Sequence, residues 1–170
     1  DKHVINTWRP DGYDNVPNGQ YKWVHYNCER LEEWHIEWLK SLPRTLNFYA
    51  DGYNYCIQHQ FDDGYGVPES RYEFNQFWEM QTGNRYKEKV PRRLIFGHSH
   101  RQMMCNLGDG MEWLNPGSIS YRRPDDPDKS AHYIVIQDGI VNLRHVMYDR
   151  TKLYKTAKSF IDNPRMMRTE

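Results

Sequence analysis

The chain has 170 residues, 23 basic against 23 acidic side chains and a hydrophobic fraction of 38%. This length predicts a single domain over residues 1–170, and no apolar run reaches the ~18 residues that a membrane span needs. The balanced charge argues against an extended nucleic-acid surface. Three cysteines without C-x-x-C spacing suggest neither a disulfide framework nor a cysteine zinc site, which favours the reducing cytoplasm.

The first third of the chain predicts a loop, a helix and a hairpin. Asp, Asn, Gly and Pro are frequent through residue 20, which predicts an irregular segment with at most a short helix near its start. An amphipathic helix ending at Pro43 follows from apolar residues at three- and four-residue steps: Leu31, Trp34, Trp38, Leu39 and Leu42. Strands are expected at 46–49 and 53–58, joined by Asp51-Gly52.

The remaining elements alternate between helical and strand patterns. Residues 69–81 are compatible with a helix, and an apolar run at 93–96 predicts a buried strand that stops at Gly97. Further strands are expected at 102–106, 111–114, 131–137 and 140–147, and a final helix at 151–161. This order predicts an α+β or α/β fold with much antiparallel pairing.

Two short motifs carry the chemistry. Gly97-His98-Ser99-His100 lies where a buried strand stops, and imidazole is the commonest ligand of zinc, iron and similar metals. By itself the motif is equally compatible with a chance pair of histidines. Asn115-Pro116-Gly117-Ser118 follows the 111–114 strand and is built for a tight turn that presents polar groups, although an ordinary β-turn has the same composition.

Together the segments RLIFGHSHRQ, LNPGSIS and AHYIVIQDG resemble the C-terminal portion of calcineurin-like metallophosphoesterases. The similarity in pattern runs from the helix near Leu31 to about Tyr148, and is greatest to the bacterial branch of YfcE-type phosphodiesterases and diadenosine-polyphosphate hydrolases. The resemblance implies a four-layer αββα fold of the α+β class, a two-sheet β-sandwich flanked by helices. This chain would supply the C-terminal part of that domain.

The resemblance also implies a metal site. His98 would bind the same ion as His59, which ends the 53–58 strand, and His100 would bind a second ion. In the family a glycine often follows the histidine at the position of His59, where this chain has Gln60. The two divalent transition-metal ions, manganese, iron or zinc, would activate a hydroxide for hydrolysis of phosphomonoesters or phosphodiesters. The substrate would be a small phosphorylated molecule, for example a nucleotide.

The family's earlier motifs, D-x-H, G-D-x-x-D and G-N-H-[D/E], do not occur in the chain. We therefore expect an N-terminal half to be missing, with Asp1 as a supporting carboxylate and the general acid lying before it. The fragment alone is then expected to be inactive, and its partner to be the missing half or a second copy. The alternative is a non-catalytic phosphoesterase-like scaffold or protein-binding module.

Substrate recognition is less directly encoded. Asn115, Ser118 and Arg101 are candidates for binding the substrate, although solvated surface charge is the simpler interpretation of Arg101. Aromatic residues after His59 could stack a nucleobase, but core or lid packing is the favoured interpretation of them: Phe61, Tyr65, Tyr72, Phe74, Phe77 and Trp78. Cys56 is interpreted as a packing residue, and His132 and His145 as strand residues without a ligand role.

Overall fold

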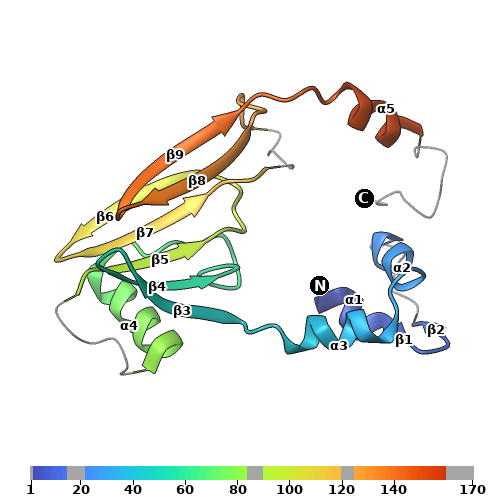
Figure 1. The fold of residues 1–170 in the computed structure, drawn as a ribbon, viewed down its shortest axis with the longest axis horizontal. Coiled ribbons are helices and arrows are strands. Elements are labelled where there is room, and N and C mark those ends of the chain that lie inside the picture. Colours follow the sequence, from blue (N-terminus) through green and yellow to red (C-terminus); the bar gives the residue numbers. More distant parts are fainter. Residues whose placement is uncertain (1, 15–21, 84–89, 120–124, 160–170) are drawn as a thin grey trace. The chain divides into compact units, whose positions relative to one another are not determined.

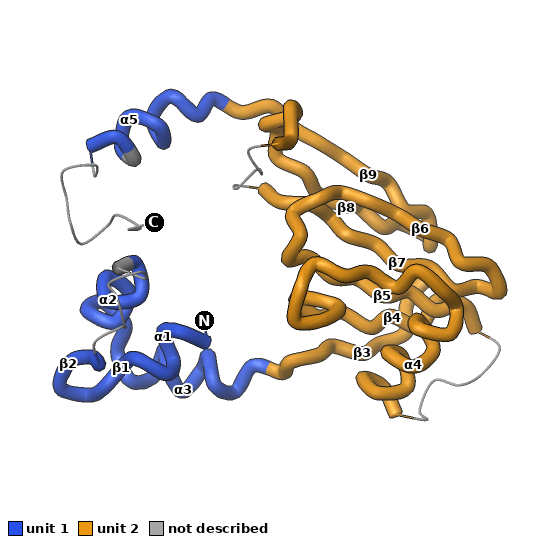
Figure 2. The backbone as a smooth tube through the Cα atoms, turned by 180° about the vertical axis from the view of Figure 1, so that it is seen from behind, with its two compact units in different colours: residues 1–42, 149–170 blue, residues 43–148 orange. Residues whose placement is uncertain are grey.

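The computed structural model describes residues 2–14, 22–83, 90–119 and 125–159. Contacts divide the chain into two compact units, residues 1–42 with 149–170, and residues 43–148, drawn in blue and orange in Figure 2. The single domain expected over 1–170 stays a prediction. Within the described ranges, no helix has the length and apolar character needed to cross a bilayer.

The first unit is mainly helical. Its elements are α1 (Lys2–Thr7), β1 (Trp8–Arg9), β2 (Gly12–Tyr13), α2 (Lys22–Cys28), α3 (Glu33–Ser41) and α5 (Thr151–Ser159). Helices α1, α2 and α3 share a small buried cluster of Val4, Val24, Cys28 and Ile36. The sequence predicted α3, a short helix near the start and α5 as far as it is described, but α2 was not expected.

Helix α3 buries a different side from the one that its Trp residues indicated. Ile36 is 1% exposed, whereas Trp34 and Trp38 are 62% and 57% exposed. His35 is part of the capping box at the start of α3, because its ring accepts a hydrogen bond from the Glu32 backbone N–H. Trp34 stacks on this ring, so its orientation is set by the helix start rather than by the core.

The second unit is built on a five-stranded mixed sheet, β3-β4-β5-β7-β6 (Figure 1). Strands β4, β5 and β7 run parallel at its centre, with β3 and β6 antiparallel at the edges. The elements are β3 (Thr45–Ala50), β4 (Tyr53–Gln58), α4 (Arg71–Thr82), β5 (Arg92–Phe96), β6 (Gln102–Gly108), β7 (Met111–Pro116), β8 (Ala131–Gln137) and β9 (Ile140–Val146). Each predicted strand of this unit is therefore confirmed, with ends that differ by a residue or two.

The two faces of the sheet have different chemistry because side chains alternate along a strand. On one face, Cys56 and Leu94 pack with α4 into the main core, whose other members are Phe74, Phe77, Trp78, Phe96, Met111 and Trp113. On the other face, Tyr55, Arg93 and Glu112 are neighbours across β4, β5 and β7. Of the aromatic residues expected to pack, Phe61, Phe74, Phe77 and Trp78 belong to or contact this core, whereas Tyr65 and Tyr72 are 67% and 69% exposed.

The β8–β9 hairpin contacts the five-stranded sheet at two separate places. Gln102 on β6 donates its side-chain amide to the carbonyls of Tyr133 and Arg144, at 2.8 and 3.0 Å. Near the hairpin turn, Gly139 lies so close to the carbonyl of Asp51 that a Cβ there would be 3.0 Å from it. The predicted α+β class, with helices flanking a mixed sheet, is confirmed.

Candidate functional site

The parallel strands bring the two sequence motifs to one edge of the sheet. His59 follows the last residue of β4, Gly97 and His98 follow β5, and Asn115 lies near the end of β7. The carboxyl ends of parallel strands meet at the same edge, which is where open sheets place their binding sites. A hydrogen bond of 2.9 Å from the Gly97 N–H to the His59 carbonyl joins the first two loops.

The side chains of His59 and His98 meet at this edge. Nε2 of His59 lies 3.2 Å from Nδ1 of His98. Two nitrogens bound to one tetrahedral ion at ~2.0–2.1 Å would be roughly 3.3 Å apart, so this pair fits the first coordination shell of a single ion. Burial and the neighbouring His98 lower the pKa of His59, which favours the neutral imidazole that a metal requires.

The loop after β5 has an unusual backbone. His98 and His100 both have positive φ angles, 63° and 58°, and the Ser99 N–H donates to the Gly97 carbonyl at 2.7 Å. Residues with a Cβ rarely adopt this left-handed conformation, and such positions concentrate at functional sites. The loop thus turns sharply enough to place His98 next to His59. The ligand roles of His59, His98 and His100 stay predictions.

Asn115 connects the two motifs through its side chain. This residue is 1% exposed, and its amide N–H groups donate to the Gly97 carbonyl at 2.8 Å and to Ser99 Oγ at 2.9 Å. Its Oδ1 accepts the Gly117 N–H at 2.9 Å. Asn115 therefore holds the turn after β7 against the loop that carries His98. Its expected contact with substrate stays a prediction.

We expect Asn115→Ala to lower the free energy of unfolding by about 1–3 kcal/mol, because it leaves the Gly117 N–H without its acceptor and removes the hydrogen bonds to the Gly97 carbonyl and Ser99 Oγ. Urea unfolding of the purified protein measures the change. Asn142→Ala is the matched control, since among the described residues that amide makes one long contact, of 3.5 Å, to the Ile140 carbonyl. Equal losses in the two variants would contradict the bracing role of Asn115.

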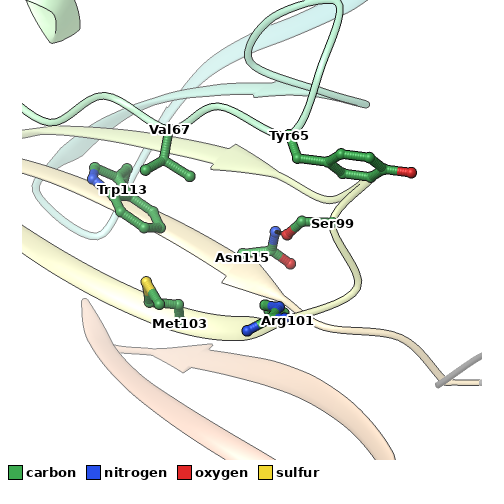
Figure 3. A pocket seen from close by; sticks show the side chains of 7 residues that line it. All are labelled: Tyr65, Val67, Ser99, Arg101, Met103, Trp113 and Asn115. Atoms are coloured by element: carbon green, nitrogen blue, oxygen red, sulfur yellow. Dashed lines mark hydrogen bonds between the residues drawn. The ribbon is translucent and has the colours of Figure 1, made fainter. Parts of the chain in front are cut away.

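A cavity of about 280 Å³ lies beside this loop (Figure 3). Its lining residues are Tyr65, Val67, Ser99, Arg101, Met103, Trp113 and Asn115. The Tyr65 ring stacks on His98 with 5.0 Å between centroids, so the cavity begins next to the histidine pair. Arg101 pairs with Asp125 at 2.6 Å, and both side chains are more than half exposed. The cavity can accept an apolar or aromatic group next to the histidines.

Other expected residues have separate outcomes. Asp1 lies outside the described residues, so its role as a carboxylate stays a prediction. The Ser118 carbonyl accepts the His132 N–H at 2.9 Å, and its part in substrate binding stays a prediction as well. Cys56 is 1% exposed and burial raises its pKa to about 12, which agrees with packing and leaves no thiolate at neutral pH.

One cluster of potential metal ligands was not expected from the sequence. Asp128, His132 and His145 each offer a ligand atom, and these atoms lie within 4.8 Å of one another. The sequence did contain a signal for the two histidines, because a two-residue turn at Asp138-Gly139 fixes the register of the hairpin and sets His132 opposite His145. Asp128 precedes the strand, and the sequence carried no comparable signal for it.

No model of a known protein family matches the chain, and neither does any curated protein. The structure is similar to that of the hypothetical protein PH1004 from Pyrococcus horikoshii, with a TM-score of 0.64 and 17% identity, over 92% of this chain and 64% of that one. It is also similar to a metallophosphoesterase from Sphaerobacter thermophilus, with a TM-score of 0.60 and 15% identity, over 98% of this chain and 71% of that one. The chain thus spans slightly less than two thirds of the Pyrococcus protein, and it shares the fold of the metallophosphoesterase.

Proposed function

We propose that the protein takes part in metal-dependent hydrolysis of phosphomonoesters or phosphodiesters. The observation that supports this most directly is the 3.2 Å separation of the His59 and His98 ring nitrogens, which suits two ligands of one ion. The pair lies at the carboxyl edge of a sheet whose fold a metallophosphoesterase shares. Manganese, iron and zinc all suit imidazole ligands.

The chain's own residues would hold and orient the reacting groups. His59 and His98 would bind one divalent ion, and His100 a second one on the same loop. Two such ions, when bound, supply an activated water and stabilise the leaving oxygen. In the reaction a water oxygen bonds to phosphorus, the phosphorus–oxygen bond to the leaving group breaks, and the leaving oxygen takes up a proton. Asn115 would keep the His98 loop in place through its bond to the Gly97 carbonyl.

The cavity supports a substrate with an apolar or aromatic leaving group. Tyr65 and Trp113 offer ring faces and edges, and Met103 adds an adaptable apolar wall. Arg101 lies at the same cavity, where it could pair with a phosphate oxygen in exchange for Asp125. A phosphodiester of the kind cleaved by the YfcE-type branch, or a nucleotide, fits this description. The cytoplasmic location and a partner that completes the site are part of the same proposal.

The direct test is hydrolysis of bis(4-nitrophenyl) phosphate by the full-length, metal-depleted protein with and without Mn²⁺. We expect activity only with the metal, and a loss of at least about 10- to 100-fold in His59→Ala and in His98→Ala. His35→Gln is the matched control, because glutamine also completes the capping box of α3 and leaves the site unchanged.

Two results would reject the proposal. One is hydrolysis that persists after chelation or in both histidine variants. The other is tight binding of Mn²⁺ by His59 and His98 without hydrolysis of monoesters or diesters, which would favour the alternative of a non-catalytic scaffold.

A further inference from the structure

We infer that Asp128, His132 and His145, here called the hairpin triad, form a binding site for one divalent transition-metal ion of the zinc type. The triad shares no residue with the His59–His98 pair, so the inference is independent of the proposed hydrolysis. It rests on strand register, on the orientation of the Asp128 carboxylate and on the distances between ligand atoms.

The register of the hairpin sets the two histidines opposite each other. His132 on β8 and His145 on β9 are Cα partners in the antiparallel ladder. Side chains at such positions project to the same face with Cβ atoms ~4.5–5.5 Å apart. Their ring centroids are 6.1 Å apart with an interplanar angle of 88°. The ligand nitrogens of the two imidazoles thus lie within 4.8 Å of each other, a separation that a modest rotation of the exposed His145 ring would shorten to that of two ligands on one ion.

The carboxylate of Asp128 is oriented by the turn before β8. Its Oδ1 accepts the Ser130 backbone N–H at 2.7 Å. Its Oδ2 faces the histidines, 2.8 Å from Nε2 of His132 and 3.9 Å from Nδ1 of His145. Hydrogen bonds from Ser130 and then from His132 hold the pKa of the Asp128 carboxyl well below its usual range. One oxygen is thus fixed by the backbone while the other is presented, charged, to both rings.

The distances suit a transition metal. Ligand atoms on a tetrahedral ion with bonds of ~2.0–2.1 Å are roughly 3.3 Å apart, and the two Asp128–histidine separations fall on either side of this value. Two imidazoles and one carboxylate are a ligand set of Zn²⁺ and Fe²⁺ sites, whereas Mg²⁺ and Ca²⁺ prefer oxygen alone. The side chain of His132 is 12% exposed and that of His145 68%, so an ion could enter and keep an open position for water.

The position of the triad gives the ion a structural role. The Asp138-Gly139 turn closes one end of the β8–β9 hairpin, and His132 and His145 lie near the other end. A two-stranded hairpin is marginal by itself. An ion bound to His132 and His145 would join the two strands at this open end. The same ion would also tie Asp128, which precedes β8, to both strands. It would stabilise the folded hairpin because the unfolded chain offers no assembled site.

The test uses Co²⁺ as a spectroscopic probe of the full chain after metal removal. In a His59→Ala/His98→Ala background, we expect one equivalent of Co²⁺ to bind with visible d–d absorption. Adding His145→Ala or Asp128→Asn should weaken this binding at least about tenfold. The background with Val146→Ala, a neighbouring exposed position on β9, should bind as before. Zn²⁺ should raise the melting temperature of the background but not of the His145→Ala variant, and Mg²⁺ should raise neither.

A second measurement covers the case in which the background variant does not fold. In the otherwise unaltered protein, NMR of the histidine ring nitrogens should show Zn²⁺-induced shifts at His132 and His145, and His145→Ala should bind one ion fewer. An unchanged affinity in the His145→Ala variant, or no Co²⁺ bound by a folded background, would overturn the site and leave the triad as a hydrogen-bonded Asp128–His132 pair beside a second imidazole.

Discussion

Arg93→Met is expected to lower the free energy of unfolding by about 3–5 kcal/mol, because it leaves the Glu112 carboxylate buried without its partner. The two side chains are 3% and 11% exposed, and Arg93 Nε donates to Glu112 Oε2 at 2.8 Å. Arg93 also donates to Tyr55 Oη at 3.0 Å and lies 3.4 Å from the centre of the Tyr53 ring. Burial by itself would lower the pKa of Arg93, but hydrogen bonds to Glu112 and Tyr55 outweigh it and raise the pKa.

Urea unfolding, followed by both far-UV circular dichroism and tryptophan fluorescence, measures this loss. Arg101→Met is the matched control: it breaks the exposed pair with Asp125 and should cost no more than about 1 kcal/mol. Replacing both buried partners, as Arg93→Met/Glu112→Leu, should recover much of the stability because no unpaired charge then stays buried. A double variant as unstable as the single one would show that packing, rather than the unpaired charge, causes the loss.

Trp78→Ala is expected to have an effect of similar size, about 3–5 kcal/mol, because it opens a cavity under α4. Trp78 is 0% exposed and stacks with Phe74 at 5.9 Å between centroids. Within the part of the chain that the structure describes, its indole Nε1 is buried with no hydrogen-bond partner. The ring therefore contributes through packing in the core and through the Arg92 guanidinium, which lies 5.7 Å from its centroid.

The buried indole N–H leads to a second expectation, for the variant that keeps an aromatic ring. Trp78→Phe should cost only about 1–2 kcal/mol, since a phenyl ring refills most of the cavity and removes an unpaired buried N–H. Tyr72→Ala on the same helix, where the side chain is 69% exposed, is the control and should change stability by less than about 0.5 kcal/mol. A Phe variant as unstable as the Ala variant would mean that the indole N–H has a partner that stabilises the fold.

The fold could be predicted from the sequence where the local signals were strong. Asp51-Gly52 and Asp138-Gly139 form the expected hairpin turns, and Asp51 and Asp138 take the positive φ angles, 48° and 51°, that such turns require. The helix α2 could not be predicted, because its buried side, as far as it is described, consists of Val24 and Cys28, too few apolar positions to give a helical period. The burial of Arg93 was equally hidden, since a charged residue is expected at the surface until its partner on β7 is known.

In the candidate site, too, the features set by local sequence could be predicted and those set by strand pairing could not. The sequence located His98 and Asn115 at strand ends, because both follow apolar runs that stop at turn residues. It did not show that Asn115 Nδ2 bonds the Gly97 carbonyl, since that contact depends on parallel pairing of β5 with β7. The hairpin triad needed the same kind of information, namely the strand register together with the conformation of the turn that holds Asp128.

The mixed order of the strands has a consequence for the way the protein folds. The antiparallel pairs β3–β4, β6–β7 and β8–β9 join neighbouring segments, and isolated hairpins of this kind form in about 1–10 μs. The parallel pairs β4–β5 and β5–β7 must close longer loops, which slows their formation. His59, His98 and Asn115 lie at the ends of these parallel strands. We therefore expect the edge that carries the histidine pair to be assembled late, so that refolding rates followed at Tyr65 beside His98 will be slower than those of the β8–β9 hairpin.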